Sequence, residues 1–139
     1  MDARDWHLPV ERHGLSRVYP PDDYADMQRR GLLFVLDGEN GALLGAAALL
    51  PEDERWNGQP SRRAWYVHNL VTAVGVSGAG KAILREARKL ASSRSMESMR
   101  LDCADDNTRL NAWYDSQGDV PCGTCTDGPC HGILRDKLL

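Results

Sequence analysis

The chain has 139 residues, a formal net charge of −3 at pH 7 and four cysteines. This length predicts one domain spanning 1–139, large enough to bury a normal core. The charge excludes a basic field of the kind that attracts nucleic acid. No apolar run reaches the length of a membrane span and the first residues do not resemble a signal peptide, so we expect a cytoplasmic protein with reduced cysteines.

The first third of the chain predicts short helices followed by a hairpin. Residues 1–30 contain three prolines and predict turns and short helices, one of which Asp22 or Asp23 is suited to cap. The apolar runs 32–36 and 42–50 flank the sequence DGENG, a strong turn signal, and together they predict a β-hairpin.

A polar loop and a strand lead into a glycine-rich turn. The loop, 51–63, is long enough to border a binding cleft, and the β-like run 64–73 follows it. The turn VGVSGAGK, at 74–81, is followed by the helical run AILREARKLAS. Glycines at a strand-to-helix junction let backbone N–H groups point at a phosphate, and the helix N-terminus adds partial positive charge. We therefore expect a phosphorylated cofactor.

Two patterns compete for this turn. Gly75, Gly80 and Lys81 fit the nucleoside-triphosphate pattern G-x-x-x-x-G-K-[ST], except that Ala82 replaces the hydroxyl that holds magnesium. Gly78 and Gly80 fit the second half of the R/Q-x-x-G-x-G/A loop that binds the coenzyme A pyrophosphate in the GNAT family of N-acetyltransferases. Gly75 stands where that family has Arg or Gln. The turn alone does not decide between the two.

The downstream residues favour the acetyltransferase. A triphosphatase needs several parallel strands after its loop, and only one good strand, Met99–Ala104, follows here. Asn107, then Tyr114 seven residues later and Gly118 four residues after that, resemble the N…Y-x-x-x-G-F segment of the GNAT family. Asp119 departs from the Phe of that pattern, which removes a packing anchor beside the cofactor.

The resemblance, firmest over 65–118, implies an α/β fold. In this family a mixed central sheet is splayed between two parallel strands and carries helices on both faces. Those parallel strands would be Trp65–Thr72 and Met99–Ala104. The family's first strand is not recognised, because the helical N-terminal stretch starts almost at Met1, so we expect that strand to be missing.

The resemblance also implies a cosubstrate and a reaction. Acetyl-coenzyme A would donate its acetyl group directly to an amine, on a small molecule or a peptide, in a ternary complex. Backbone groups of Leu70, Val71 and Thr72 would bind the pantetheine arm. The remaining cofactor contacts would come from the glycine-rich turn and the later motif: Gly75, Gly78, Ala79, Gly80, Lys81, Ala82, Asn107 and Tyr114.

Two residues are candidates for proton transfer. Tyr114 is the candidate general acid for the leaving thiolate, although its helical face also suits a core aromatic residue. Ala64 stands where relatives often place a base and cannot serve, while His68 lies on the same strand face as Tyr66 and histidine is a residue type that often acts as a general base. His68 is therefore the candidate base, with a packing role as the alternative. The preceding loop offers further candidates, Glu52, Asp53 and Glu54.

The C-terminal segment contains three of the four cysteines. Cys122-x-x-Cys125 followed by Cys130 and His131 has the composition of a zinc knuckle. The last two are adjacent and would point apart in an extended chain, so we assign no metal site and expect unlinked thiols in a loop, with a redox pair as an alternative. A closing strand is expected over 131–139.

Two other functional classes stay open. An acyl-coenzyme A-binding module without catalysis would agree with Ala64, Gly75 and Asp119. A zinc-stabilised interaction protein on the same fold would use the cysteines. Trp56, among the acidic residues of the 51–63 loop, hints at a cationic acceptor. Homodimers are common among the proteins that this chain resembles.

Overall fold

The computed structural model describes residues 33–37, 43–72 and 78–139. In chain order the elements are β1 (Leu33–Asp37), β2 (Leu43–Leu50), η3 (Glu54–Trp56), β3 (Ala64–Thr72), α2 (Ala79–Ser93), β4 (Ser98–Ala104), α3 (Thr108–Ser116), β5 (Val120–Asp127) and β6 (Cys130–Leu138). The expected helix near Asp22 or Asp23, the hairpin turn after β1 and the question of a missing first strand lie outside the described residues. None of the described helices is long and apolar enough to cross a membrane.

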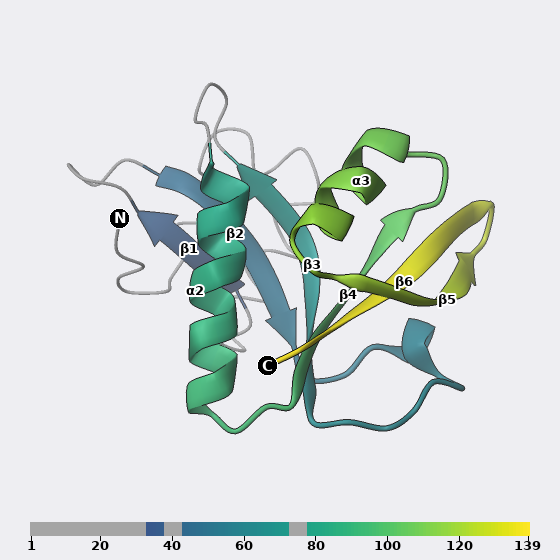
Figure 1. Ribbon diagram of the computed structural model, residues 1–139, viewed down its shortest axis with the longest axis horizontal. Helices are drawn as coiled ribbons and strands as arrows, with labels where there is room; N and C mark the ends of the chain where they lie inside the picture. Colours follow the sequence, from purple (N-terminus) through teal and green to yellow (C-terminus); the bar gives the residue numbers. More distant parts are fainter. Residues whose placement is uncertain (1–32, 38–42, 73–77) are drawn as a thin grey trace. The chain divides into compact units, whose positions relative to one another are not determined.

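The strands form a mixed sheet in the order β1-β2-β3-β4-β6-β5 (Figure 1). β1 and β2 are antiparallel, as are β4 and β6, and β5 and β6. β3 and β4 pair in parallel from Ala64↔Ser98 to Tyr66↔Arg100, which is the parallel pair that the sequence predicted. The expected α/β fold with a mixed sheet is therefore confirmed.

The described chain divides into two compact units. One contains residues 33–49 and 68–87, and the other contains 50–67 and 88–139, so that β3 and α2 each contribute to both. In the first unit Ile83 and Ala87, which lie four residues apart on one face of α2, are buried. A Cβ at Gly45 would lie 2.6 Å from the carbonyl oxygen of Val71 and would also meet Ile83. Glycine is therefore needed on β2 at this close approach.

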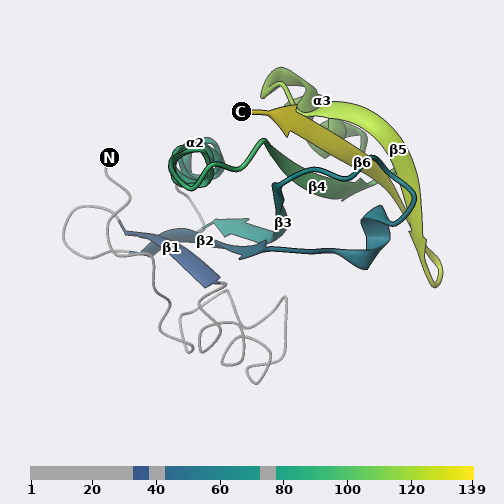
Figure 2. The same ribbon diagram turned by 90° about the horizontal axis from the view of Figure 1, so that it is seen from below.

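The second unit is built on β4 and on the hairpin β5–β6. Its apolar cluster contains Trp56, Ala64, Tyr66 and Leu134. Figures 1 and 2 show α3 alongside β4 and the hairpin. Burial along these strands depends on more than alternation, because Arg100 is buried between apolar neighbours that face the other way.

The expectation of a cysteine-bearing loop before one closing strand is wrong. Residues Val120–Asp127 form a second strand, which pairs along its length with Cys130–Leu138. Gly128 has φ +59° in the turn between them, a conformation that glycine adopts readily. β5 is largely exposed, so it lacks the apolar alternation that would have revealed it.

Candidate functional site

The predicted phosphate cradle lies at the start of α2, in the first unit. Gly78 has φ +78°, and Ala82 N donates a hydrogen bond to its carbonyl oxygen at 3.1 Å, which closes the first helical turn. The following residue, Ala79, is buried, whereas Lys81 is exposed. The first-turn N–H groups of a helix lack intrahelical partners and favour anions. Gly75 lies outside the described residues.

The predicted pantetheine contacts lie at the end of β3, also in the first unit. Leu70 and Val71 are half-buried and Thr72 is exposed. Because β3 ends at Thr72, its last backbone groups directly precede the glycine-rich turn in the chain. Backbone donors of this kind are fixed before a ligand binds.

Tyr114 is buried on α3, in the second unit. Asn107 caps this helix, since its side chain accepts a hydrogen bond from Leu110 N at 3.0 Å. The Tyr114 side chain is 7 % exposed and its ring meets that of Trp113 edge-on. Burial, with a smaller contribution from Cys103, raises the pKa of Tyr114 to about 12. The phenol is therefore protonated at neutral pH and available as a proton donor.

Asp119 occupies the position where the GNAT pattern has Phe. It is 3 % exposed, and its backbone N–H donates to the carbonyl oxygen of Tyr114 at 3.1 Å. Burial raises the pKa of its carboxyl group above the usual value. A buried carboxyl group thus takes the place of the apolar anchor, and the backbone of this residue is hydrogen-bonded to that of Tyr114.

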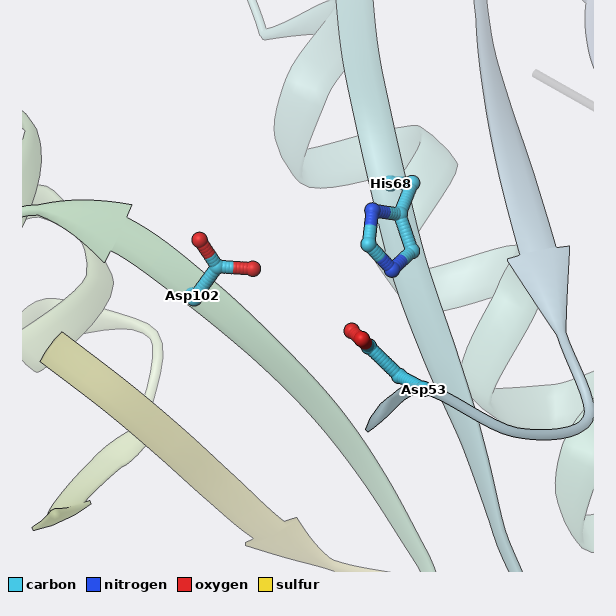
Figure 3. Close-up of side chains that lie close together, drawn as sticks. All are labelled: Asp53, His68 and Asp102. Carbon is cyan, nitrogen blue, oxygen red and sulfur yellow. The ribbon is translucent and has the colours of Figure 1, made fainter. Parts of the chain in front are cut away.

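Two carboxylates of the second unit lie within 4.8 Å of one another, Asp53 before η3 and Asp102 on β4 (Figure 3). Arg55 lies against both, since its backbone N–H donates to Asp53 and its guanidinium is 3.4 Å from Asp102. The same guanidinium forms a 2.9 Å ion pair with Asp127, and this contact is the main cause of the raised pKa of Arg55. The arginine therefore already supplies positive charge at this carboxylate pair.

The other candidate bases differ in exposure. His68 is half-buried on β3, directly after Val67, and Figure 3 labels it. Glu52 and Glu54 are exposed, whereas Asp53 is half-buried and caps η3.

Three cysteines and His131 lie along the β5–β6 hairpin. Among the described residues, the ligand atoms of Cys122, Cys125, Cys130 and His131 do not converge. The cysteines are free, and burial raises the pKa of Cys122 and of Cys125. Thiols with a raised pKa are poor nucleophiles at neutral pH, which argues against a redox pair.

Two buried cations were missed by the sequence analysis. Arg100 and Arg135 are each 2 % exposed. Arg100 donates to Tyr66 Oη at 3.1 Å and to the Pro60 carbonyl at 2.7 Å, and it stacks on Trp56 at 4.6 Å. The Trp56 ring, part of the pattern that hinted at a cationic acceptor, is a buried core residue that stacks on Arg100. The signal that could have revealed both cations is an arginine inside a predicted strand.

The comparisons with known proteins agree with this architecture. The family model described as "Acetyltransferase (GNAT) family" matches residues 1–118. No curated protein shows significant sequence similarity.

Solved structures show the same fold. A GNAT-family acetyltransferase from Listeria monocytogenes has a TM-score of 0.74 at 22% identity, covering 93% of this chain and 78% of that one. Ard1 from Thermoplasma volcanium has a TM-score of 0.74 at 14% identity, over 96% and 95% of the two chains. Naa20 from Chaetomium thermophilum, in complex with a bisubstrate analogue, has a TM-score of 0.71 at 13% identity, covering 95% of this chain and 84% of that one. With most of its length matched by the family model, the chain belongs to the GNAT family of acetyltransferases.

Proposed function

We propose that the protein transfers the acetyl group of acetyl-coenzyme A to an amine by direct attack in a ternary complex. Family membership supports an acetyl donor, and the bisubstrate analogue bound to Naa20 is consistent with a ternary complex in that relative. The observation that carries the proposal is the buried, protonated phenol of Tyr114.

The start of α2 is the proposed binding site for the pyrophosphate. The first-turn N–H groups at Ala79, Gly80 and Lys81 carry the partial positive charge of a 15-residue helix. The backbone of Leu70–Thr72 is proposed to bind the pantetheine arm, as in the family. These contacts use main-chain atoms. Cofactor binding should therefore depend less on the side chains here than on the glycines that shape the turn.

The chemical step moves two protons. The neutral amine attacks the acetyl carbon, the C–N bond forms and the C–S bond breaks, and the departing sulfur takes the hydroxyl proton of Tyr114. The proton lost by the amine goes to a base, for which His68 is our candidate and Asp53 the alternative. After product release the base loses its proton to solvent and the Tyr114 phenolate takes one from solvent, which restores both groups.

A second function is favoured by two observations. Ala64 is buried where relatives often carry a base, and Asp119 replaces the Phe of the motif. Both agree with a module that binds acyl-coenzyme A without turning it over. The acceptor of an active enzyme would be a small-molecule or peptide amine.

The first test measures release of the coenzyme A thiol from acetyl-coenzyme A with a panel of small amines and peptides. We expect turnover with at least one acceptor, and we expect Tyr114→Phe to lower kcat by about 100-fold, because general acid catalysis contributes that much. The acetyl-coenzyme A dissociation constant, measured by calorimetry, should stay unchanged, since the variant removes only a hydroxyl.

The matched control is Tyr66→Phe, a second buried tyrosine whose hydroxyl accepts a hydrogen bond from Arg100. It should alter stability but retain kcat. If acetyl-coenzyme A binds and no amine in the panel is acetylated, the binding module is the better description.

A further inference from the structure

β6 holds α3 through a buried guanidinium. Arg135 Nη1 donates to Asp115 Oδ1 at 2.6 Å and to the carbonyl oxygen of Asp119 at 2.8 Å. Its Nη2 donates to Asn111 Oδ1 at 3.0 Å. The arginine is 2 % exposed, and these hydrogen bonds replace water at both Nη atoms, while Nε has no hydrogen-bond partner among the described residues. Three acceptors from α3 and the turn after it are thereby fixed to one planar group.

These acceptors bracket Tyr114 in the chain. Asn111 precedes it by three residues on α3, and Asp115 follows it directly. The Asp119 residue whose carbonyl is held also donates its N–H to the Tyr114 carbonyl oxygen. The backbone that carries the phenol is thus tied to Arg135 on both sides.

A second cation on β6, Lys137, binds the C-terminal end of α3. Lys137 Nζ donates to the Gln117 carbonyl oxygen at 2.6 Å. It also lies next to Gly118, where an added Cβ would come within 2.8 Å of Nζ. Gly118 has φ +82°, so the turn after α3 needs the conformational freedom of glycine.

We propose that Arg135 is a positioning residue for the general acid Tyr114. This inference rests on the proposed function, because it gives Tyr114 its catalytic role. In the family motif an apolar Phe follows the glycine, and here Asp119 stands in its place. Arg135 supplies the missing anchor by holding the Asp119 carbonyl and the α3 side chains instead of a ring.

The positive charge of Arg135 should also favour proton donation by Tyr114. Its positive charge lowers the pKa of Tyr114, partly offsetting the effect of burial. A guanidinium near the phenol therefore makes it a better proton donor, while burial keeps it protonated. The groups that face Tyr114 with the opposite effect are Cys103, Asp119 and Asp102.

A double-mutant cycle on kcat tests this proposal. Arg135→Met should lower kcat by about 10- to 100-fold when Tyr114 is present, because a small displacement of a catalytic group has an effect of that size. In a Tyr114→Phe background the same change should have little further effect, since there is no phenol left to position. The acetyl-coenzyme A dissociation constant should stay unchanged in all four proteins.

Two further variants keep the test decisive. Arg63→Met removes an exposed arginine, whose partner is Glu97 at 3.4 Å, and should retain kcat. If Arg135→Met lowers the folded fraction, Arg135→Lys replaces it in the cycle, because lysine keeps the charge but lacks the planar fork that serves three acceptors.

The outcomes separate this inference from the proposed function. Equal losses of kcat in the wild-type and Tyr114→Phe backgrounds would overturn the positioning role, since they indicate a general effect on the fold. Turnover that is indifferent to Tyr114→Phe would also overturn it, while leaving acetyl transfer itself established. Absence of turnover by the wild-type protein with bound acetyl-coenzyme A contradicts the proposed function first.

Discussion

At the scale of single residues, Asp119 links stability to pH. Its side chain is 3 % exposed, and Oδ2 has no hydrogen-bond partner among the described residues. Burial raises its pKa in the folded protein, although Arg88, Lys137 and Arg135 act in the opposite direction. The folded state therefore binds this proton more tightly than the unfolded chain does. The resulting stabilisation is complete below the unfolded pKa and is lost as the pH rises through the folded pKa.

Asp119→Asn should consequently stabilise the protein near neutral pH. The amide removes the buried negative charge and leaves the backbone carbonyl that Arg135 binds. We expect the free energy of unfolding to rise by about 1 kcal/mol at pH 7, with the difference shrinking toward pH 4. Urea unfolding across this pH range measures it. The exposed carboxyl group of Asp106 gives the control, because Asp106→Asn should change little at any pH. A less stable Asp119→Asn at pH 7 would show that the three cations need the carboxylate.

At the scale of elements, the end of α2 contains a residue in an unfavourable conformation. Met96 N donates to the Ala91 carbonyl oxygen at 3.0 Å and Ser95 N donates to that of Ser92 at 3.1 Å. This pair of hydrogen bonds is a Schellman motif, whose penultimate position is usually glycine. Ser95 occupies it with φ +62°, where a Cβ is disfavoured by roughly 1 kcal/mol.

Ser95→Gly should therefore raise the free energy of unfolding by about 0.5–1 kcal/mol. Chemical unfolding of the variant and the wild type measures the difference. Ser92→Gly is the matched control: the residue is exposed and lies within α2, so glycine should destabilise there by a similar amount. Destabilisation by both changes would mean that the helix end relaxes to another conformation.

The same elements show what the sequence could predict. α3 begins directly after Asn107, a residue type that caps helices and does cap this one. β4 contains the strand predicted at Met99–Ala104, and Arg100 is buried on the face opposite to its apolar residues. β5 was missed because its two faces are largely exposed and its sequence, VPCGTCTD, has no apolar period.

The partners of the buried arginines were beyond prediction for a different reason. Arg135 is buried because Asn111, Asp115 and the Asp119 carbonyl satisfy its guanidinium, and these partners lie 16 to 24 positions away in the chain. A local sequence pattern cannot identify partners that lie so far away in the chain. The candidate acid was found from the spacing of Asn107 and Tyr114, whereas the residue that holds it depends on tertiary structure.

At the scale of the whole molecule, ligand binding should be visible as thermal stability. A ligand that binds only the folded state at one hundred times its dissociation constant adds about 2.7 kcal/mol. For a chain of 139 residues this corresponds to a rise in Tm of roughly 9 °C, from the average unfolding entropy per residue. We expect acetyl-coenzyme A to give a rise of this order, and ATP with magnesium to give none, because Ala82 lacks the hydroxyl that a triphosphate site uses to hold the metal.

The titration should include desulfo-coenzyme A as a matched ligand. It retains the pyrophosphate and most of the pantetheine arm, so a site formed by the α2 N-terminus and the backbone of β3 should bind it almost as well. A similar rise in Tm with both coenzyme A ligands would locate the binding energy in contacts far from the thioester. A rise with ATP and magnesium but not with acetyl-coenzyme A would instead assign the glycine-rich turn to a nucleotide. Because Tm responds to any ligand of the folded state, this comparison tests the cosubstrate before an acceptor amine is known.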